Sequence, residues 1–313
     1  MRDSDVQAFF RAAGTGQIDE VRRFLDEQPD VVNAVGPHPF WGGRPQALHV
    51  AIESDRAGIF ELLLERGADV NGSNDAYDRW SPFMLAIQRG RSAMRDELLR
   101  RGAPVGLFEA LLLGDDAFLS NVDALPAETP NNASPLAFAR TPRAIERLIA
   151  LGASTTAKDR WGTTPIQALS ALGPAGAPLV RLLIAHGVEA SPIEYARLGD
   201  LDAIAADPSN AHDDAILMAA VDRGHHALAS WLLEHGANPN ARTKGQSRQT
   251  ALHSAAWNGD LRMAQILVAA GADPKLVDEE HHTTPQHWAE VSFDIRQQEG
   301  CREVAKFLGD TTS

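Results

Sequence analysis

The chain has 313 residues, a formal net charge of −13 at pH 7 and a single cysteine, Cys301. This acidity argues against nucleic acid and anionic membranes as ligands, because both require a basic surface. A single cysteine excludes a disulfide framework and a cysteine-based zinc cluster. With 44% hydrophobic residues and no apolar run approaching a bilayer span, we expect a folded cytoplasmic protein that does not cross a membrane.

Glycines that end predicted helices give the chain a repeating organisation. Each is followed by Ala or Val, and together they are Gly67, Gly102, Gly152, Gly187, Gly236 and Gly271. Their spacings are 35, 50, 35, 49 and 35 residues, so alternate glycines lie 84 or 85 residues apart. Glycine suits these positions because helices commonly end in a left-handed conformation. The pattern indicates that a larger, irregular unit was duplicated.

In chain order, the pattern predicts about ten pairs of short helices, beginning with helices near 5–13 and 18–27. The fourth and seventh pairs lack the long polar loop that precedes the others. We expect Thr250 to cap a helix and prolines to occupy first turns, and these prolines are Pro82, Pro135, Pro165 and Pro285. The predicted units are 4–35, 36–70, 71–105, 106–126, 127–154, 155–190, 191–210, 211–240, 241–274 and 275–313.

Two stretches indicate the type of repeat. Thr250-Ala251-Leu252-His253 followed by Ala255, and Ala47-Leu48-His49 followed by Ala51, resemble the T-P-L-H-x-A signature of ankyrin repeats. The chain thus resembles ankyrin-repeat proteins of the bacterial type. The resemblance implies an all-α solenoid of about ten helix pairs, with short β-hairpin or loop fingers, forming a single domain over residues 1–313.

The signature histidines have a structural interpretation. His49, His253 and His287 occupy that position, where the resemblance implies a hydrogen bond to the preceding threonine or its loop. The pair His281-His282 lies in a predicted loop tip after three acidic residues. A metal site is the alternative for this pair, but two adjacent histidines fall short of a recognised zinc spacing, so we favour a solvated polar tip. The sequence therefore predicts neither a metal nor a cofactor.

Catalytic motifs are absent from the sequence, which contains no G-x-S-x-G, H-E-x-x-H, P-loop or complete G-x-G-x-x-G pattern. Cys301 has no base nearby in sequence, and we interpret it as a packing residue. The sequence assigns no catalytic residue, and we lean towards a protein that is not an enzyme.

Tryptophans in predicted loops give the clearest indication of a binding surface. Trp41, Trp80 and Trp161 fall in the fingers, and Trp257 falls at the end of an inner helix. Exposed Trp beside Arg is typical of binding hot spots; the alternative is that these side chains pack against neighbouring fingers. The residues that we expect to form a binding site in one concave groove are Trp41, Arg44, Tyr77, Asp78, Trp80, Arg160, Trp161, Trp257, Asn258, His281 and His282.

The resemblance favours a non-catalytic binding or scaffold module, a monomer that recognises a partner protein through its concave face and fingers. The acidity of the chain indicates a neutral or basic partner. The alternative is an unusual enzyme or small-molecule binder, whose pocket would use polar groups of Asp78, Asp159, Arg160, His281 or His282 between tryptophan walls. A flat face favours the first function, and a deep pocket with converging acids and histidines favours the second.

Overall fold

The chain divides into two compact units in the computed structural model. The residues described are 2–40, 42–72, 76–244, 247–296 and 298–312. Unit 1 comprises Met1–Leu169 and Arg181–Leu183, and unit 2 comprises Ser170–Val180 and Ile184–Ser313.

Helices account for all the regular structure within the described ranges. One isolated antiparallel β-bridge, between Arg242 and Thr250, is the single instance of β-pairing there. The predicted all-α fold is therefore confirmed, and of the fingers only the loop at 242–250 shows the beginning of a hairpin in these ranges. No described helix combines the length and the apolar character needed to span a bilayer.

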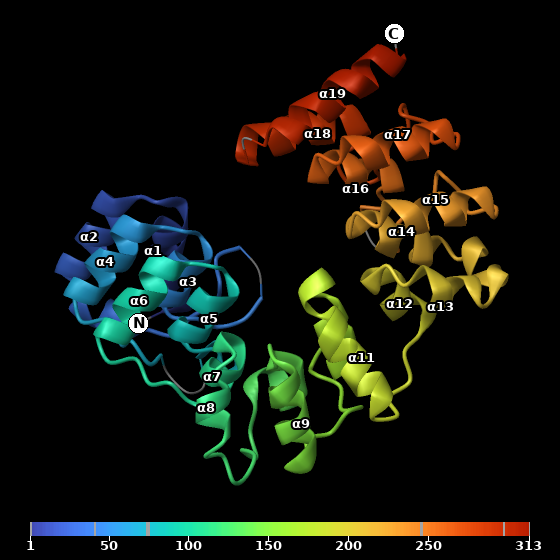
Figure 1. The fold of residues 1–313 in the computed structure, drawn as a ribbon. Helices are drawn as coiled ribbons and strands as arrows, with labels where there is room; N and C mark the ends of the chain where they lie inside the picture. Colours follow the sequence, from blue (N-terminus) through green and yellow to red (C-terminus); the bar gives the residue numbers. More distant parts are fainter. Residues whose placement is uncertain (1, 41, 73–75, 245–246, 297, 313) are drawn as a thin grey trace. The chain divides into compact units, whose positions relative to one another are not determined.

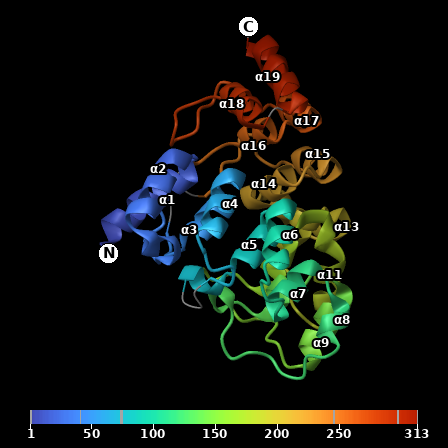
Figure 2. The same ribbon diagram turned by 90° about the vertical axis from the view of Figure 1, so that its left-hand side faces the viewer.

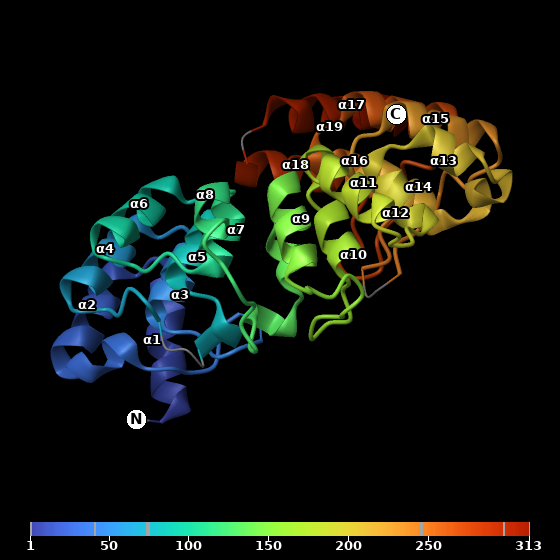
Figure 3. The ribbon, with the colours of Figure 1, turned by 60° about the horizontal axis from the view of Figure 1, so that its bottom comes forward.

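Unit 1 consists of helix pairs arranged in two rows, and Figure 3 shows α2, α4 and α6 on one side and α1, α3 and α5 on the other. Within the inner row α1 packs on α3, α3 on α5 and α5 on α7, and the pairs follow one another in this order in Figure 2. The inner-row helices are α1 (Asp3–Thr15), α3 (Ala47–Glu53), α5 (Pro82–Gln88) and α7 (Leu107–Leu113). The outer-row helices are α2 (Ile18–Glu27), α4 (Ala57–Glu65), α6 (Ser92–Arg100), α8 (Asp116–Leu119) and α9 (Pro142–Ala150).

Unit 2 repeats this arrangement, and Figure 1 shows α12, α14 and α16 in one row and α13, α15 and α17 in the other. The inner-row helices are α12 (Pro192–Leu198), α14 (Asp214–Asp222), α16 (Ala251–Asn258) and α18 (Pro285–Arg296). The outer-row helices are α13 (Leu201–Ala205), α15 (His226–Glu234), α17 (Leu261–Ala269) and α19 (Glu299–Thr312). The boundary between the units falls within α10 (Pro165–Ser170) and α11 (Ala177–Ala185).

Short 3-10 helices occupy several connections. In the fifth pair, the inner helix is itself reduced to the 3-10 helix η4 (Pro135–Phe138), which packs on α9. The others are η1 (Pro29–Asn33), η2 (Ala76–Arg79), η3 (Pro130–Asn132), η5 (Gly173–Ala175) and η6 (Pro208–His212).

Helix starts follow the proline and capping signals of the sequence. Helices α5, α10 and α18 begin at Pro82, Pro165 and Pro285, and η4 begins at Pro135. Proline suits a first turn because its fixed φ matches the helix and its missing N–H needs no partner there. Thr250 caps α16. These predictions of local structure are confirmed.

The buried cores combine large aromatic side chains with small ones. Phe9, Phe10 and Phe60 are completely buried in unit 1, whereas Ala220 and Ala255 are completely buried between inner-row helices of unit 2. Small residues allow neighbouring helices to approach closely, and the larger side chains fill the remaining volume at the density of a protein interior. Each pair is therefore stabilised mainly by its neighbours.

A close backbone approach joins the end of α16 to the start of α19. Gly259 has a φ of +66°, and a Cβ added at Gly300 would lie only 2.5 Å from the Gly259 carbonyl oxygen. A Cβ added at Gly259 would in turn lie 2.7 Å from the backbone nitrogen of Cys301. Neither backbone can move aside easily, so glycine is required at both positions of this contact.

Signature histidines link consecutive repeats. In His253, Nδ1 accepts the Thr250 backbone N–H at 3.1 Å and Nε2 donates to the Thr283 carbonyl at 2.9 Å. His49 donates in the same way to the Trp80 carbonyl at 2.8 Å. Both histidines therefore play the structural role that the resemblance implied.

His287 does not follow this pattern. Its ring is exposed, and its Nδ1 lies 3.6 Å from a Glu290 carboxylate oxygen. Helix α19 follows α18 in the element order, and no finger among the described residues after α18 offers the ring a carbonyl. This third histidine is linked to the preceding Thr284 through its backbone N–H, at 3.4 Å from the hydroxyl, and its ring does not make the bond between repeats that His49 and His253 make.

Candidate functional site

A cavity of about 450 Å³ lies against the inner row of unit 1, and we call it the finger cavity. Five residues predicted for the binding site line it, and these are Tyr77, Asp78, Trp80, Arg160 and Trp161. The sequence did not point to its other polar walls, Glu53, Gln88, Arg89 and Asn131.

An unusual backbone conformation orients the side chains of the loop before α5. Tyr77 and Asp78 both adopt left-handed conformations, with φ of 51° and 54°, which are strained for residues with a side chain. The Tyr77 N–H donates to the Arg44 carbonyl at 3.0 Å, and its hydroxyl donates to Glu53 at 2.6 Å. These contacts fix the loop at the edge of the cavity.

Glu53 is a buried carboxylate whose hydrogen bonds position this loop. Its side chain is 1% exposed and accepts from Tyr77, from Arg89 at 3.1 Å and from His38 Nε2 at 3.0 Å. The Phe40 N–H donates to His38 Nδ1 at 3.2 Å, so the ring proton is on Nε2. Burial alone would raise the pKa of the Glu53 carboxyl, but these hydrogen bonds hold the pKa below its usual value.

The finger at 159–163 presents the most exposed large apolar side chain recorded in the described residues. Trp161 is 66% exposed, and the Arg160 guanidinium lies over its ring, 5.2 Å from the centroid. Arg160 also forms an ion pair with Asp78, and its backbone N–H donates to the Asn131 carbonyl at 3.0 Å. The Asp159 carboxylate accepts the Trp161 N–H at 2.9 Å, which rigidifies the tip.

Trp80 and Arg44 are engaged in contacts within unit 1. The Trp80 ring is half-buried and lies 5.7 Å from the Phe138 ring, between centroids, as the packing alternative expects. The Arg44 guanidinium forms a two-pronged ion pair with Asp3, at 2.9 and 3.0 Å, and the residue is not among those lining the finger cavity. Trp41, which was predicted for the same site, lies outside the described residues.

A second cavity, of about 430 Å³, contains the predicted residues Trp257 and His281 in unit 2. The Trp257 and Trp288 rings meet edge to face, 5.8 Å apart between centroids. Asn258 and His282 do not line this cavity; the Asn258 amide is 3.5 Å from the Asp222 carbonyl, and His282 is exposed. The single groove expected to combine residues of both units stays a prediction.

The loop that carries His281 is organised around a buried aspartate. Asp278 is completely buried and accepts the backbone N–H groups of His281 at 2.6 Å and Thr283 at 3.1 Å, together with the Trp288 ring N–H at 3.1 Å. Burial alone would raise the pKa of this carboxyl, but the donors hold the pKa well below its usual value. Within the described ranges, no three His, Cys, Asp or Glu side chains are grouped to bind a metal ion.

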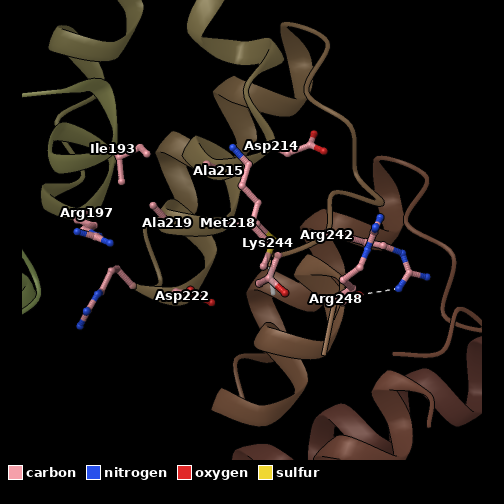
Figure 4. Close-up of a pocket in the computed structure, with 12 residues that line it drawn as sticks. Ile193, Arg197, Asp214, Ala215, Met218, Ala219, Asp222, Arg242, Lys244 and Arg248 are labelled. Atoms are coloured by element: carbon pink, nitrogen blue, oxygen red, sulfur yellow. Dashed lines mark hydrogen bonds between the residues drawn. The ribbon is translucent and has the colours of Figure 1, made fainter. Parts of the chain in front are cut away.

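A third and larger cavity, of about 730 Å³, lies on the inner row of unit 2, and we call it the basic cavity (Figure 4). Two carboxylates border it, those of Asp214 and Asp222. Its cationic lining side chains are Arg197, Arg223, Arg242, Lys244 and Arg248. None of these residues was predicted from the sequence to form a site.

Comparison with known proteins gives matches in both units. A family model described as ankyrin repeats (3 copies) matches residues 9–109, and another described as ankyrin repeats (many copies) matches residues 216–268. The chain is an ankyrin-repeat protein. Ankyrin repeats are generally modules of protein–protein interaction.

Relatives of this ankyrin-repeat protein have varied functions. A probable E3 ubiquitin-protein ligase of Oryza sativa subsp. japonica is 31% identical over 109 residues, which are 35% of this chain and 23% of the ligase. An inactive serine/threonine-protein kinase of Mus musculus is 32% identical over 33% of this chain and 7% of its own length. Cyclin-dependent kinase 4 inhibitor B of Mus musculus is 26% identical over 32% of this chain and 94% of the inhibitor. The chain thus spans less than a quarter of the first two relatives.

A signal for the missed residues was present in the repeat register. The binding-site prediction included Trp257, which stands two positions before the turn glycine Gly259. The equivalent positions before Gly90 and Gly224 are Gln88 and Asp222, which line the finger cavity and the basic cavity of this ankyrin-repeat protein. Aligning the ends of the inner helices would have found them.

Proposed function

We propose that this ankyrin-repeat protein binds a partner protein at the finger cavity of unit 1, with Trp161 as the central anchor. The observation that carries the proposal is the exposed Trp161 ring, held under Arg160 beside a cavity of about 450 Å³. Exposing an indole costs solubility, and tryptophan and arginine are enriched among residues that dominate binding energy.

The side chains of the finger cavity are already held in place before a partner binds, which favours tight recognition. Arg160 is fixed by Asp78, and Tyr77 is fixed by Glu53, so little side-chain entropy is lost when a partner binds. Glu53 accepts from three donors in this arrangement. The charged groups at the cavity thus serve mainly to position the aromatic side chains, as expected for a binding surface.

The test compares capture by the full chain with capture by Trp161→Ala. Proteins retained from a lysate of the source cells are identified by mass spectrometry, and the dissociation constant of each candidate is then measured by calorimetry. We expect at least a tenfold weaker complex with Trp161→Ala, since a hot-spot residue contributes about 2 kcal/mol or more.

Leu99→Ala is the matched control, because Leu99 is an apolar side chain of unit 1 that is 51% exposed and lies outside the cavity. The control should bind like the natural chain. A partner whose affinity is equal for the natural chain and for Trp161→Ala would contradict the proposal.

Small-molecule binding is a second candidate function for the same cavity. Its volume of about 450 Å³ falls within the range of ligand pockets. Mass spectrometry of small molecules released from the captured chain tests this function. A metabolite that is retained by the natural chain and lost in Trp161→Ala would support it over protein binding.

A further inference from the structure

Five cationic side chains line the basic cavity of unit 2, and three of them form no salt bridge within the described residues. Arginines of this acidic chain commonly pair with carboxylates, as Arg66 does with Asp26 at 2.7 Å. By contrast, the residues that the structure describes place no carboxylate within salt-bridge distance of Arg197, Arg223 or Lys244. Among the described residues, these three cations at one cavity therefore form no salt bridge; Arg197 donates to the Ser170 hydroxyl at 3.4 Å, and the nearby Asp222 carboxylate offsets the charges of Arg197 and Arg223 only in part.

The remaining cations, Arg242 and Arg248, are fixed by contacts at the finger. The Arg242 guanidinium donates to the Arg248 carbonyl at 2.6 Å and to the Val277 carbonyl at 3.1 Å. Arg248 lies 3.2 Å from Glu279, with both side chains about half-exposed. Carbonyl contacts leave the charge of Arg242 uncompensated, so this wall of the cavity is positive and held in place.

Apolar side chains form the floor between these cations. Ile193 of α12 and Ala215, Met218 and Ala219 of α14 line the cavity. Figure 4 shows Arg197 and Arg242 on opposite sides of Met218. A site for a single small anion would converge its donors on one point, whereas this arrangement separates them across an apolar surface.

We propose that the basic cavity binds an acidic segment of a partner protein, in which an apolar side chain stands between carboxylates. The apolar side chain covers Met218, while the carboxylates pair with Arg197 and Arg223, which lie near the ends of α12 and α14, and with Lys244 of the finger. Carboxylate hydrogen bonds to arginine and lysine are charge-assisted and stronger than neutral ones. The cavity of about 730 Å³ has room for several side chains.

The composition of the chain indicates a neutral or basic partner, whereas the basic cavity would bind an acidic one. A net charge of −13 describes the field far from the chain, but recognition depends on the local arrangement of charges. An otherwise acidic surface disfavours non-specific binding of acidic segments elsewhere. The proposal concerns unit 2 and does not depend on the finger cavity of unit 1.

The test uses short labelled peptides and the full chain. One peptide contains glutamate and leucine, and its control replaces every glutamate with glutamine; binding is followed by fluorescence anisotropy. We expect the glutamate peptide to bind and the glutamine peptide not to bind. We also expect Arg197→Gln/Arg223→Gln/Lys244→Gln to weaken binding at least tenfold, and added salt to weaken it in the natural chain.

The matched control is Arg262→Gln/Lys275→Gln/Lys306→Gln, which removes three exposed cations of unit 2 outside the cavity. This variant should keep the natural affinity, and circular dichroism checks that both triple variants are folded. Equal losses in the two variants would overturn the proposal, as would equal binding of the glutamine peptide or no binding of the glutamate peptide. Direct binding of inorganic phosphate or ATP, measured by calorimetry, together with no binding of the glutamate peptide would overturn the proposal in favour of a small-anion site. Trp161→Ala should leave peptide binding unchanged, so this result is independent of the function proposed for unit 1.

Discussion

His49 illustrates how a single residue couples local capping to the packing of repeats. The ring is completely buried, Nδ1 accepts the Gln46 N–H at 3.2 Å, and Nε2 donates to the Trp80 carbonyl at 2.8 Å. Both bonds require the neutral tautomer with the proton on Nε2. Burial lowers the pKa of His49 to about 4, because a charged ring would lose its hydration.

This lowered pKa predicts a loss of stability in mild acid. Between pH 6.5, the ordinary value for histidine, and about pH 4 the unfolded chain binds a proton on His49 that the folded chain does not. Acid therefore favours unfolding across this window, by up to about 3 kcal/mol from this group. His49→Gln should be less stable than the natural chain at pH 7 and should lose less on acidification. Urea midpoints at pH 7 and pH 4.5 measure both effects.

The exposed His186 provides the control for this pH dependence. His186→Gln should leave both urea midpoints close to those of the natural chain. If His49→Gln shows the same acid-induced loss as the natural chain, the buried neutral ring is not the source of that loss.

At the scale of elements, turn glycines do not all have the same importance. Gly224 and Gly259 end consecutive inner helices with φ of +69° and +66°. Nearest to a Cβ added at Gly224 is an Asp260 carboxylate oxygen at 3.5 Å, whereas a Cβ at Gly259 meets the Cys301 backbone nitrogen at 2.7 Å. The first position requires only an unusual φ, and the second also requires the absence of a side chain.

We therefore expect Gly259→Ala to be much more destabilising than Gly224→Ala. The Gly224 variant should cost about 1 kcal/mol for its left-handed backbone. The Gly259 variant adds overpacking against α19, which costs a further 1–3 kcal/mol or so. Thermal melts of the two single variants provide the comparison. Similar losses of melting temperature would mean that α19 moves away without cost.

Helix pairs could be predicted from the sequence because the residues that start and end each helix lie within or beside it. Contacts between fingers could not be predicted, because they join residues far apart in the sequence. The helix at 18–27 and the proline starts depend on residues close in sequence. The ion pair of Arg160 with Asp78 depends on a left-handed turn at Tyr77 that no local pattern requires. For the same reason the ion pair of Arg44, a residue predicted for the binding site, with Asp3 could not be predicted.

At the scale of the molecule, the division into two units governs how stability is distributed. Each repeat contacts mainly its neighbours, so stability is approximately a sum of local terms. Unit 1 and unit 2 have separate buried clusters, with Leu63 in the first and Leu232 in the second. A cavity made in one cluster should therefore have mostly local effects.

We expect Leu63→Ala to loosen unit 1 and to leave the centre of unit 2 protected. Leu63 is completely buried, and truncation at such sites costs about 2–5 kcal/mol. Hydrogen exchange with mass spectrometry should show faster exchange in α3 to α6 and unchanged exchange in α14 to α17. Leu232→Ala, also at a completely buried position, should give the reverse pattern. Equal acceleration throughout the chain in either variant would mean that the two units unfold as one.

The hydrogen bonds from His49 and His253 also constrain how a gene that encodes such a repeat protein could gain or lose repeats. Each buried Nε2–H needs the carbonyl that the next finger supplies. A deletion of that finger alone would leave a buried donor without an acceptor, at a cost of about 1–3 kcal/mol. A block that runs from one finger to the same point in the next, such as the 35-residue interval between Gly236 and Gly271, brings an equivalent carbonyl with it. Changes by whole repeat lengths, between equivalent points of two repeats, would therefore preserve these hydrogen bonds, whereas changes that shift the register would not.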